Sequence, residues 1–288
     1  MASVAPDTAV PASRAARVAV LSCIHGNMEA FEAVLEDVRG ARVDEVVCLG
    51  DLVGYGPYPN EVVRAVERDD LFCVRGCWDE AIGLERDDCG CKFASEEDAV
   101  FGKTVFDWTA RRVTARARRF LRRLPFGAAR SYPGLGKVVF VHGSPRSANE
   151  YLTIATSPLV LLERAAVADC DVLVCGHTHV PFARTIEGTL RVAELDRREH
   201  RPRATTVKVR TKLLVNAGSV GEPRDGRSES SYIILDTQEA RVEVRRVRYD
   251  VHRTAAAMRR RGLPAPLAER LLRGEELAVK TTTLACPC

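Results

Sequence analysis

Short apolar runs recur along the chain, and each of them ends in a turn that carries glycine or histidine. Valine, isoleucine, leucine and cysteine dominate these runs with little polar alternation, which is typical of strands buried on both faces. Residues 231–235 and 241–248 are predicted to form a further pair of strands. The other predicted strands cover residues 17–21, 45–49, 71–74, 137–141, 171–175 and 213–215.

Helical patterns lie between the predicted strands. Asn27 is expected to cap the first helix, whose apolar stripe starts at Met28 and which Gly40 ends. Because strand, turn and helix alternate, the pattern predicts an α/β architecture. Further helices are predicted at 60–68, at 158–168, and as two short helices within 250–273, and the polar segment 187–212 is expected to be a hairpin extension or a long loop.

The composition is that of an ordinary globular protein, with 46% hydrophobic and 28% charged residues in a chain of 288. No apolar run approaches the roughly 18 residues that a membrane span needs, so no membrane partner is expected. The formal charge of +4 is too small to indicate a nucleic-acid-binding protein by itself. We expect one domain over residues 17–275, a disordered leader at 1–16 and a cysteine-bearing tail at 276–288.

The leader is rich in alanine, proline and serine and does not have the apolar stretch of a signal peptide. Together with ten cysteines, this predicts a reducing, cytoplasmic location, where thiols are more often metal ligands, core residues or redox groups than structural disulfides.

Polar motifs follow the predicted strands at the points where they end. In open α/β sheets the carboxyl ends of the strands line the ligand crevice. Only six histidines occur in the chain, and four of them lie in these motifs, which favours a metal site over four independent core histidines. The motifs are SCIHGN at 22–27, GD at 50–51, GCWD at 76–79, HG at 142–143, GHTH at 176–179 and NAGS at 216–219.

These motifs resemble those of the calcineurin-like metallophosphoesterases, specifically the small bacterial branch, over roughly residues 17–275. The stretches that carry the resemblance are LSCIHGNMEAFEAVL, VVCLGDLVGYGPYPNEVV, VRGCWDEAI, VFVHGSP, VLVCGHTHVPF, NAGSVGEPRDG and RYDVHRTAAAMRRRGLP. The resemblance implies an α/β fold of two stacked mixed sheets flanked by helices. It also implies hydrolysis of a phosphomonoester or phosphodiester at a site with two divalent metal ions.

By matching positions, the resemblance implies that Asp51 bridges the two ions. Asn27 and the backbone of Gly26, at the start of a helix, would help to position phosphate. The residues expected to take part in catalysis are Asp51, His25, Asn27 and Trp78. The first ion would be held by His25 and His179, and the second by His142 and His177.

Three positions depart from the family pattern. Cys23 replaces an aspartate ligand of the first ion, Cys77 replaces an asparagine ligand of the second, and Trp78 replaces a histidine that contacts phosphate and helps the leaving group. Trp78 has no proton to donate near neutral pH, and loss of a general acid typically costs about 10²–10⁴ in rate. Weak activity is therefore expected on ordinary phosphoesters.

The two cysteines have three interpretations. The favoured one is that each thiolate replaces an oxygen ligand. Such a donor set suits tetrahedral zinc or iron, and manganese is a further choice. A second is that the site is retired and the chain is a binding or regulatory protein. A third is a thiol redox switch or a thiolate–metal centre with other chemistry.

The remaining cysteines divide into core residues and two CxC pairs. Cys48, Cys73 and Cys175 lie inside apolar runs and are expected to pack in the core. The pairs at 89–91 and 286–288 could capture a soft metal or be incidental thiols. The arginine-rich runs at 111–123 and 197–212 are read as solvated faces, so nucleic acid is an alternative partner that is not favoured beside a phosphoester substrate.

Overall fold

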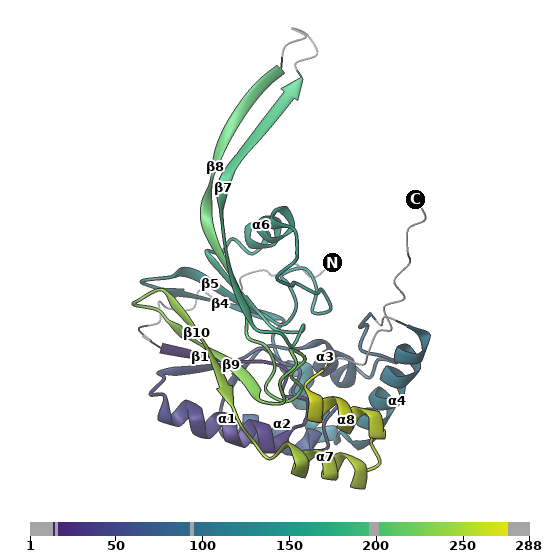
Figure 1. Ribbon diagram of the computed structural model, residues 1–288. Coiled ribbons are helices and arrows are strands. Elements are labelled where there is room, and N and C mark those ends of the chain that lie inside the picture. Colours follow the sequence, from purple (N-terminus) through teal and green to yellow (C-terminus); the bar gives the residue numbers. More distant parts are fainter. Residues whose placement is uncertain (1–13, 15–16, 93–94, 196–201, 276–288) are drawn as a thin grey trace.

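The computed structural model describes residue 14 and residues 17–92, 95–195 and 202–275. The predicted tail at 276–288 and, apart from residue 14, the predicted leader at 1–16 lie outside the described residues. Within them the chain forms two five-stranded mixed sheets flanked by helices (Figure 1), so the predicted α/β class and the two-sheet architecture are confirmed.

In the first sheet, β1 is parallel to β2, β2 is parallel to β3, and β9 and β10 extend the other edge in antiparallel register. The order across the sheet is β10 (Arg241–Val247), β9 (Ser230–Asp236), β1 (Arg17–Leu21), β2 (Glu45–Cys48) and β3 (Phe72–Cys73).

In the second sheet, β5, β6 and β8 run parallel, while β4 and β7 pair antiparallel at the edges. The predicted hairpin extension is confirmed, because β7 and β8 pair far beyond the other strands. The order is β4 (Gly127–Tyr132), β5 (Gly136–Val141), β6 (Val172–Cys175), β8 (Pro202–Asn216) and β7 (Phe182–Leu195).

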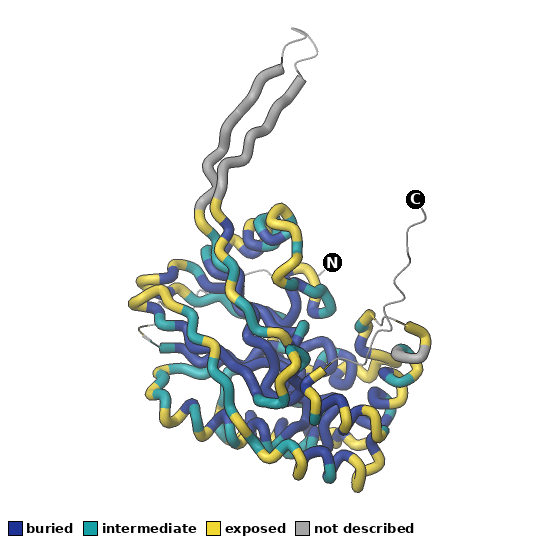
Figure 2. The backbone as a smooth tube through the Cα atoms, in the orientation of Figure 1, coloured by how far each residue is buried: buried dark blue, intermediate teal, exposed yellow. Residues whose placement is uncertain are grey.

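Alternate residues of β1 pack in two different hydrophobic cores. Val18 and Val20 of β1 face the second sheet and pack in one cluster with Phe140 of β5. Ala19 and Leu21 point the other way, into the cluster beneath the helices. Because side chains alternate across a strand, a continuous apolar run is what a strand between two layers requires. Figure 2 shows this buried interior, and Cys48, Cys73 and Cys175 lie in it as predicted.

The helices cover the outer faces of the two sheets (Figure 1). Asn27 caps the first helix by accepting a hydrogen bond from the Ala30 amide at 3.1 Å, as predicted. No helix among the described residues is both long and apolar enough to cross a membrane. The helices are α1 (Met28–Gly40), α2 (Pro59–Arg68), α3 (Cys77–Gly83), α4 (Glu96–Arg112), α5 (Ala115–Arg123), α6 (Pro158–Val167), α7 (Val251–Arg260) and α8 (Ala265–Arg273).

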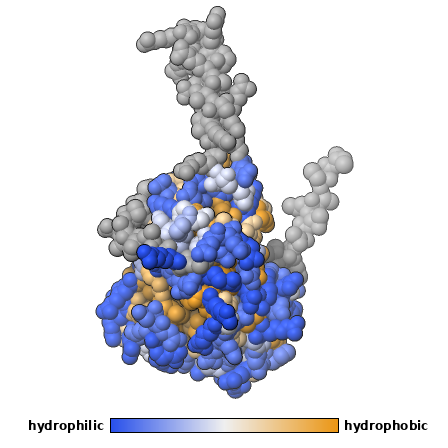
Figure 3. Space-filling model, turned by 90° about the vertical axis from the view of Figure 1, so that its left-hand side faces the viewer, coloured by the Kyte–Doolittle hydropathy of each residue, from blue (hydrophilic) through white to orange (hydrophobic). Residues whose placement is uncertain are grey.

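The arginine-rich run at 111–123 is only partly a solvated face. Arg118 donates to the carbonyl oxygen of Ile82 at 2.8 Å, and Arg122 donates to that of Gly83 at 2.9 Å. These two side chains therefore satisfy carbonyl groups at the C-terminal end of α3. The face shown in Figure 3 is largely hydrophilic, with hydrophobic patches between the hydrophilic side chains.

Asp37 ties α1 to the edge of the first sheet and makes the stability of the fold depend on pH. It accepts hydrogen bonds from the Tyr232 hydroxyl at 2.6 Å and from Arg245 at 3.0 Å. Partial burial alone would raise the pKa of Asp37, but the bonds from Arg245 and Tyr232 outweigh it and hold the pKa below its ordinary value. This stabilisation is complete above the ordinary carboxyl pKa and is lost as the pH falls through the lowered one.

We expect Asp37→Asn to lower the free energy of unfolding by roughly 1 kcal/mol at pH 7, since the pair is partly exposed and screened by water. The difference from the wild type should shrink as the pH falls below about 4, the ordinary carboxyl pKa, and through the lowered pKa of Asp37 in the folded protein. Urea denaturation at pH 7 and pH 3 measures it. Glu36→Gln, on the exposed side of the same helix, is the control. A difference that is independent of pH would contradict the assignment.

Candidate metal centre

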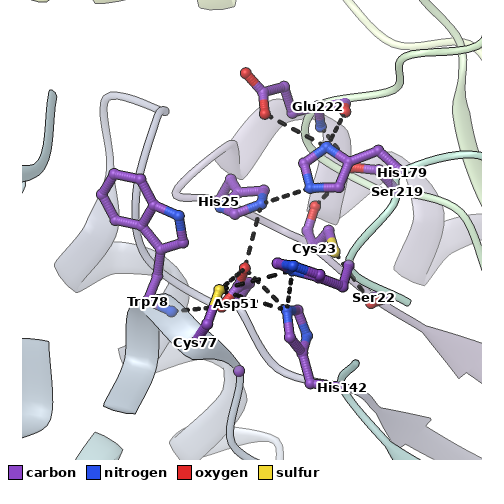
Figure 4. Close-up of polar contacts among 12 residues, drawn as sticks. Ser22, Cys23, His25, Asp51, Cys77, Trp78, His142, His179, Ser219 and Glu222 are labelled. Carbon is purple, nitrogen blue, oxygen red and sulfur yellow. Dashed lines mark hydrogen bonds and ion pairs between the residues drawn. The ribbon is translucent and has the colours of Figure 1, made fainter. Parts of the chain in front are cut away.

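At one end of the two stacked sheets, the turns that follow the parallel strands bring the polar motifs together, and Figure 4 shows their side chains. The turn after β1 is fixed to the turn after β2, because the Cys23 amide donates to the Gly50 carbonyl at 3.0 Å and the His25 amide to the Asp51 carbonyl at 2.8 Å. All seven side chains expected from the sequence to hold metal lie here, and none is more than 4% exposed.

The first donor set consists of Cys23, His25 and His179, whose ligand atoms all lie within 4.8 Å of one another. The Nε2 atoms of His25 and His179 are 3.1 Å apart. The opposite ring nitrogens are held by backbone carbonyls, Nδ1 of His25 at 3.0 Å from Val53 and Nδ1 of His179 at 2.6 Å from Glu222. Such contacts fix the orientation of each ring and leave Nε2 free to bind a cation.

The second donor set consists of Asp51, Cys77, His142 and His177, also within 4.8 Å of one another. Nε2 of His142 lies 3.1 Å from Nδ1 of His177, and the Cys77 sulfur lies 3.8 Å and 3.7 Å from these two nitrogens. The Leu49 carbonyl orients His142 through Nδ1 at 2.8 Å.

Asp51 lies between the two sets. Its Oδ2 is 3.7 Å from His25 Nε2 and 3.2 Å from His142 Nε2. Its Oδ1 accepts from the Trp78 amide at 2.9 Å, at the start of α3. Gly76 packs so closely on this carboxylate that a Cβ there would clash with Oδ1. The structure thus brings the donors together in the grouping that the resemblance implied.

Five of the seven donors have left-handed backbone conformations, which are uncommon outside glycine. The φ angles are 53° at Cys23, 50° at His25, 52° at Asp51, 65° at His177 and 62° at His179. Each such residue costs of order 1–3 kcal/mol and persists only where the surroundings enforce it. Concentration of this strain on the donors indicates that the turns are built to direct side chains to one point.

Burial and the Asp51 carboxylate shift the pKa values of the donors. Burial raises the pKa of the Cys23 thiol to about 11 and raises that of Cys77 further, while it lowers the pKa of His25 to about 4 and of His177 to about 3. Burial also opposes a charge on His142, but nearby Asp51 outweighs it and raises the pKa of that imidazole to about 10.

Two buried thiols and four imidazoles around one carboxylate are a donor set that suits a cation. A bound divalent ion would supply the positive charge that lets both thiols ionise, so metal uptake would release protons. The donors present therefore fit the ions that the resemblance implies.

Trp78 and Asn27 are placed differently from the donors. The indole of Trp78 is buried against the rings of Tyr55 and Phe106, with centroids 4.7 Å and 5.5 Å away, and it lies 6.3 Å from the His25 ring. The Asn27 amide caps α1 and donates to the Gly221 carbonyl at 2.9 Å. Asn27 thus positions two segments of the fold, and its contact with phosphate remains a prediction.

A charged network next to the first donor set is not among the features predicted from the sequence. Glu222 Oε2 lies 3.4 Å from Nδ1 of His179, and Glu222 also pairs with Arg224 and Arg270. Both guanidinium groups lie over the ring of Tyr55, at 5.5 Å and 5.0 Å from its centroid. Glu222 and Arg224 could have been noticed in the segment GEPRDG, but nothing in the sequence links Arg270 on α8 to them.

Comparison with known proteins agrees with this geometry. The model of the calcineurin-like phosphoesterase superfamily domain matches residues 17–240. An uncharacterized protein of Methanocaldococcus jannaschii is 33% identical over 264 residues, which are 89% of this chain and 98% of that protein.

Two solved structures are also similar. A metallophosphoesterase from Sphaerobacter thermophilus is 30% identical with a TM-score of 0.66, over 91% of this chain and 100% of that one. A hypothetical protein from Pyrococcus horikoshii shares the fold with a TM-score of 0.70 at 20% identity, over 91% of this chain and 99% of that one. With the family model, the relative and the arrangement of donors in agreement, this chain belongs to the calcineurin-like phosphoesterase superfamily.

Proposed function

We propose that this protein hydrolyses a phosphomonoester or phosphodiester at a site that holds two divalent metal ions. The observation that carries the proposal is the position of Asp51 between two sets of buried donors, with one carboxylate oxygen 3.7 Å from His25 and 3.2 Å from His142. A shared carboxylate is what keeps two cations close enough to act on one phosphoryl group.

Cys23, His25 and His179 would hold the first ion, and Cys77, His142 and His177 the second. These residues would hold the two ions, whose chemistry when bound would be to polarise the phosphoryl oxygens and to lower the pKa of a water molecule. The protein orients the ligands through the backbone contacts of its histidines. Burial excludes bulk water, which strengthens every electrostatic interaction in the site.

Arg224 is the residue we assign to attraction of the phosphate anion. After burial, its positive charge is the largest influence that lowers the pKa of His179. Its side chain is 10% exposed and pairs with Glu222 at 2.8 Å, so it is held in one place beside the first donor set. A fixed guanidinium group there adds a cation that recognises phosphate oxygens.

The cysteines change which ion the site prefers. Replacement of an oxygen and an amide ligand by two thiolates favours zinc or iron over manganese. Elemental analysis of protein purified without oxygen or added metal tests this, and we expect about two zinc or iron ions per chain. Near-zero metal, with no uptake of Zn²⁺, Mn²⁺ or Fe²⁺, would contradict the proposal.

Cys23→Ser and Cys77→Ser are each expected to weaken zinc binding at least tenfold, since even loss of groups that only orient ligands costs about 10–100-fold. Competition with a chromophoric chelator measures the affinity. Cys170→Ser is the matched control, because this thiol is buried in the core behind the second sheet. Unchanged metal content and affinity in both site variants would rule out thiolate ligation.

A second candidate is a binding or regulatory protein that keeps the fold. The observation that favours it is Trp78, whose indole fills an apolar cluster where the family pattern has a phosphate-contacting histidine. Binding of a partner that survives complete removal of metal, together with no turnover of an activated aryl phosphodiester in any metal-loaded form, would support this candidate.

A further inference from the structure

A third thiol lies next to the second donor set. The Cys91 sulfur is 3.6 Å from the Cys77 sulfur, although 14 residues separate the two in the chain. All eight cysteines that the structure describes are free, so this contact is not a disulfide. Cys91 is half-buried, unlike the seven donors already described.

The loop that carries Cys91 is fixed on both sides. The Gly90 amide donates to Asp88 Oδ1 at 2.7 Å, and the Asn149 side chain donates to the Cys89 carbonyl at 3.0 Å. Gly90 has a φ of +68°, and a Cβ at this position would clash with the Asn149 amide nitrogen. Asn149 belongs to the same connection after β5 that begins with His142. Contacts from that connection therefore hold the Cys91 loop near the second donor set.

The distances from the Cys77 sulfur to Cys91, His142 and His177 are those between neighbouring ligands of a tetrahedral zinc ion. With Zn–S bonds of about 2.3 Å and Zn–N bonds of about 2.05 Å, tetrahedral geometry sets two sulfurs about 3.8 Å apart, sulfur and nitrogen about 3.6 Å, and two nitrogens about 3.3 Å. The structure has 3.6 Å from Cys77 to Cys91, 3.8 Å and 3.7 Å from Cys77 to His142 and His177, and 3.1 Å between the two imidazoles.

We propose that Cys91 is a further ligand of the second metal position, which would then offer zinc or another thiophilic divalent ion two thiolates and two imidazoles beside the shared carboxylate of Asp51. This inference rests on the metal site of the proposed function and adds a residue that the motif pattern does not contain. It makes the two positions unequal. The second position becomes richer in thiolate, and the first, with fewer protein ligands, keeps more room for substrate.

The test uses the full chain loaded with Co²⁺, because thiolate ligands give cobalt an intense charge-transfer absorption that counts them. With Cys23, Cys77 and Cys91 all bound, Cys91→Ser should lose about one third of this absorption and weaken zinc binding at the second position at least tenfold. Cys89→Ser, in the same loop, and Cys170→Ser are the matched controls and should retain both. Circular dichroism checks that each variant is folded.

Alkylation of the wild-type protein tests whether Cys91 binds the metal without the need for a variant. Iodoacetamide should label Cys91 in the metal-free chain, and Zn²⁺ should protect it, as read by mass spectrometry of the peptides. Unchanged cobalt absorption and zinc affinity in Cys91→Ser, or labelling of Cys91 that Zn²⁺ does not reduce, would overturn the inference. If one of these results came from protein that still bound two ions and hydrolysed phosphoesters, the Cys91 inference would fail and the proposed function would stand. Absence of metal uptake by the wild type would overturn the proposed function as well.

Discussion

Asp51→Asn is expected to lower the rate of phosphoester hydrolysis at least about 10³-fold, because it removes the one negative charge that both metal positions share. The amide oxygen of asparagine can still accept the hydrogen bond that Oδ1 receives from the Trp78 amide at 2.9 Å. The variant should therefore fold normally and lose metal from at least one position. A larger substitution would confuse loss of charge with disruption of the turn.

The measurement is turnover of an activated aryl phosphodiester, with metal analysis of the same samples. A good leaving group is needed because the chain has Trp78 where a helper of the leaving group is expected. Asp37→Asn is the control, since it makes the same chemical change on α1, away from the donors. A rate and a metal content equal to those of the wild type would contradict the bridging role of Asp51.

The strands could be predicted well, because a strand that is buried on both faces is an uninterrupted run of apolar residues in the sequence. The run around Val18 and Val20 has no polar interruption, and the structure places alternate residues in two separate cores. The four histidines at strand ends could be expected to lie near one another for a related reason, because parallel strands end at one edge. Cys23, Asp51 and Cys77 were assigned as ligands only through the family resemblance.

Other features depend on contacts that no local pattern encodes. Arg118 and Arg122 resemble their solvated neighbours in sequence, yet they turn inward because the end of α3 presents the carbonyl groups of Ile82 and Gly83 as acceptors. The contact between Cys91 and Cys77 depends on a loop held by Asn149, which lies beyond two further helices and two strands. Arg270 reaches Glu222 only because α8 packs beside the site.

The packing of Trp78 is another feature that the sequence motif did not predict. Alignment of motifs places this residue at a catalytic position, but its side chain is 1% exposed and packs as a core residue against Tyr55 and Phe106. The motif predicted that Trp78 lies near the donors, but it did not predict that the indole packs in the apolar cluster. For the proposed hydrolysis, the consequence is a dependence on substrates that have a good leaving group.

Trp78→His is expected to raise kcat/KM about 10²-fold on an alkyl phosphoester and to change little on a nitrophenyl ester, whose leaving group needs no proton. The reason is that the indole lies 6.3 Å from the His25 ring, so an imidazole at this position would enter the same side of the site. Smaller side chains at a buried tryptophan also cost about 3 kcal/mol of stability, so rates must be compared well below the melting temperature.

Trp78→Phe separates the two effects. Phenylalanine leaves a comparable space in the cluster of Tyr55 and Phe106 but has no proton to donate. It should therefore share the loss of stability and show no gain on the alkyl ester. Equal gains in both variants would mean that the bulk of the indole, by blocking access, limits the wild type. If neither variant with metal fully bound showed a gain in kcat/KM, the binding or regulatory candidate would be favoured, because a general acid at this position would then not restore hydrolysis.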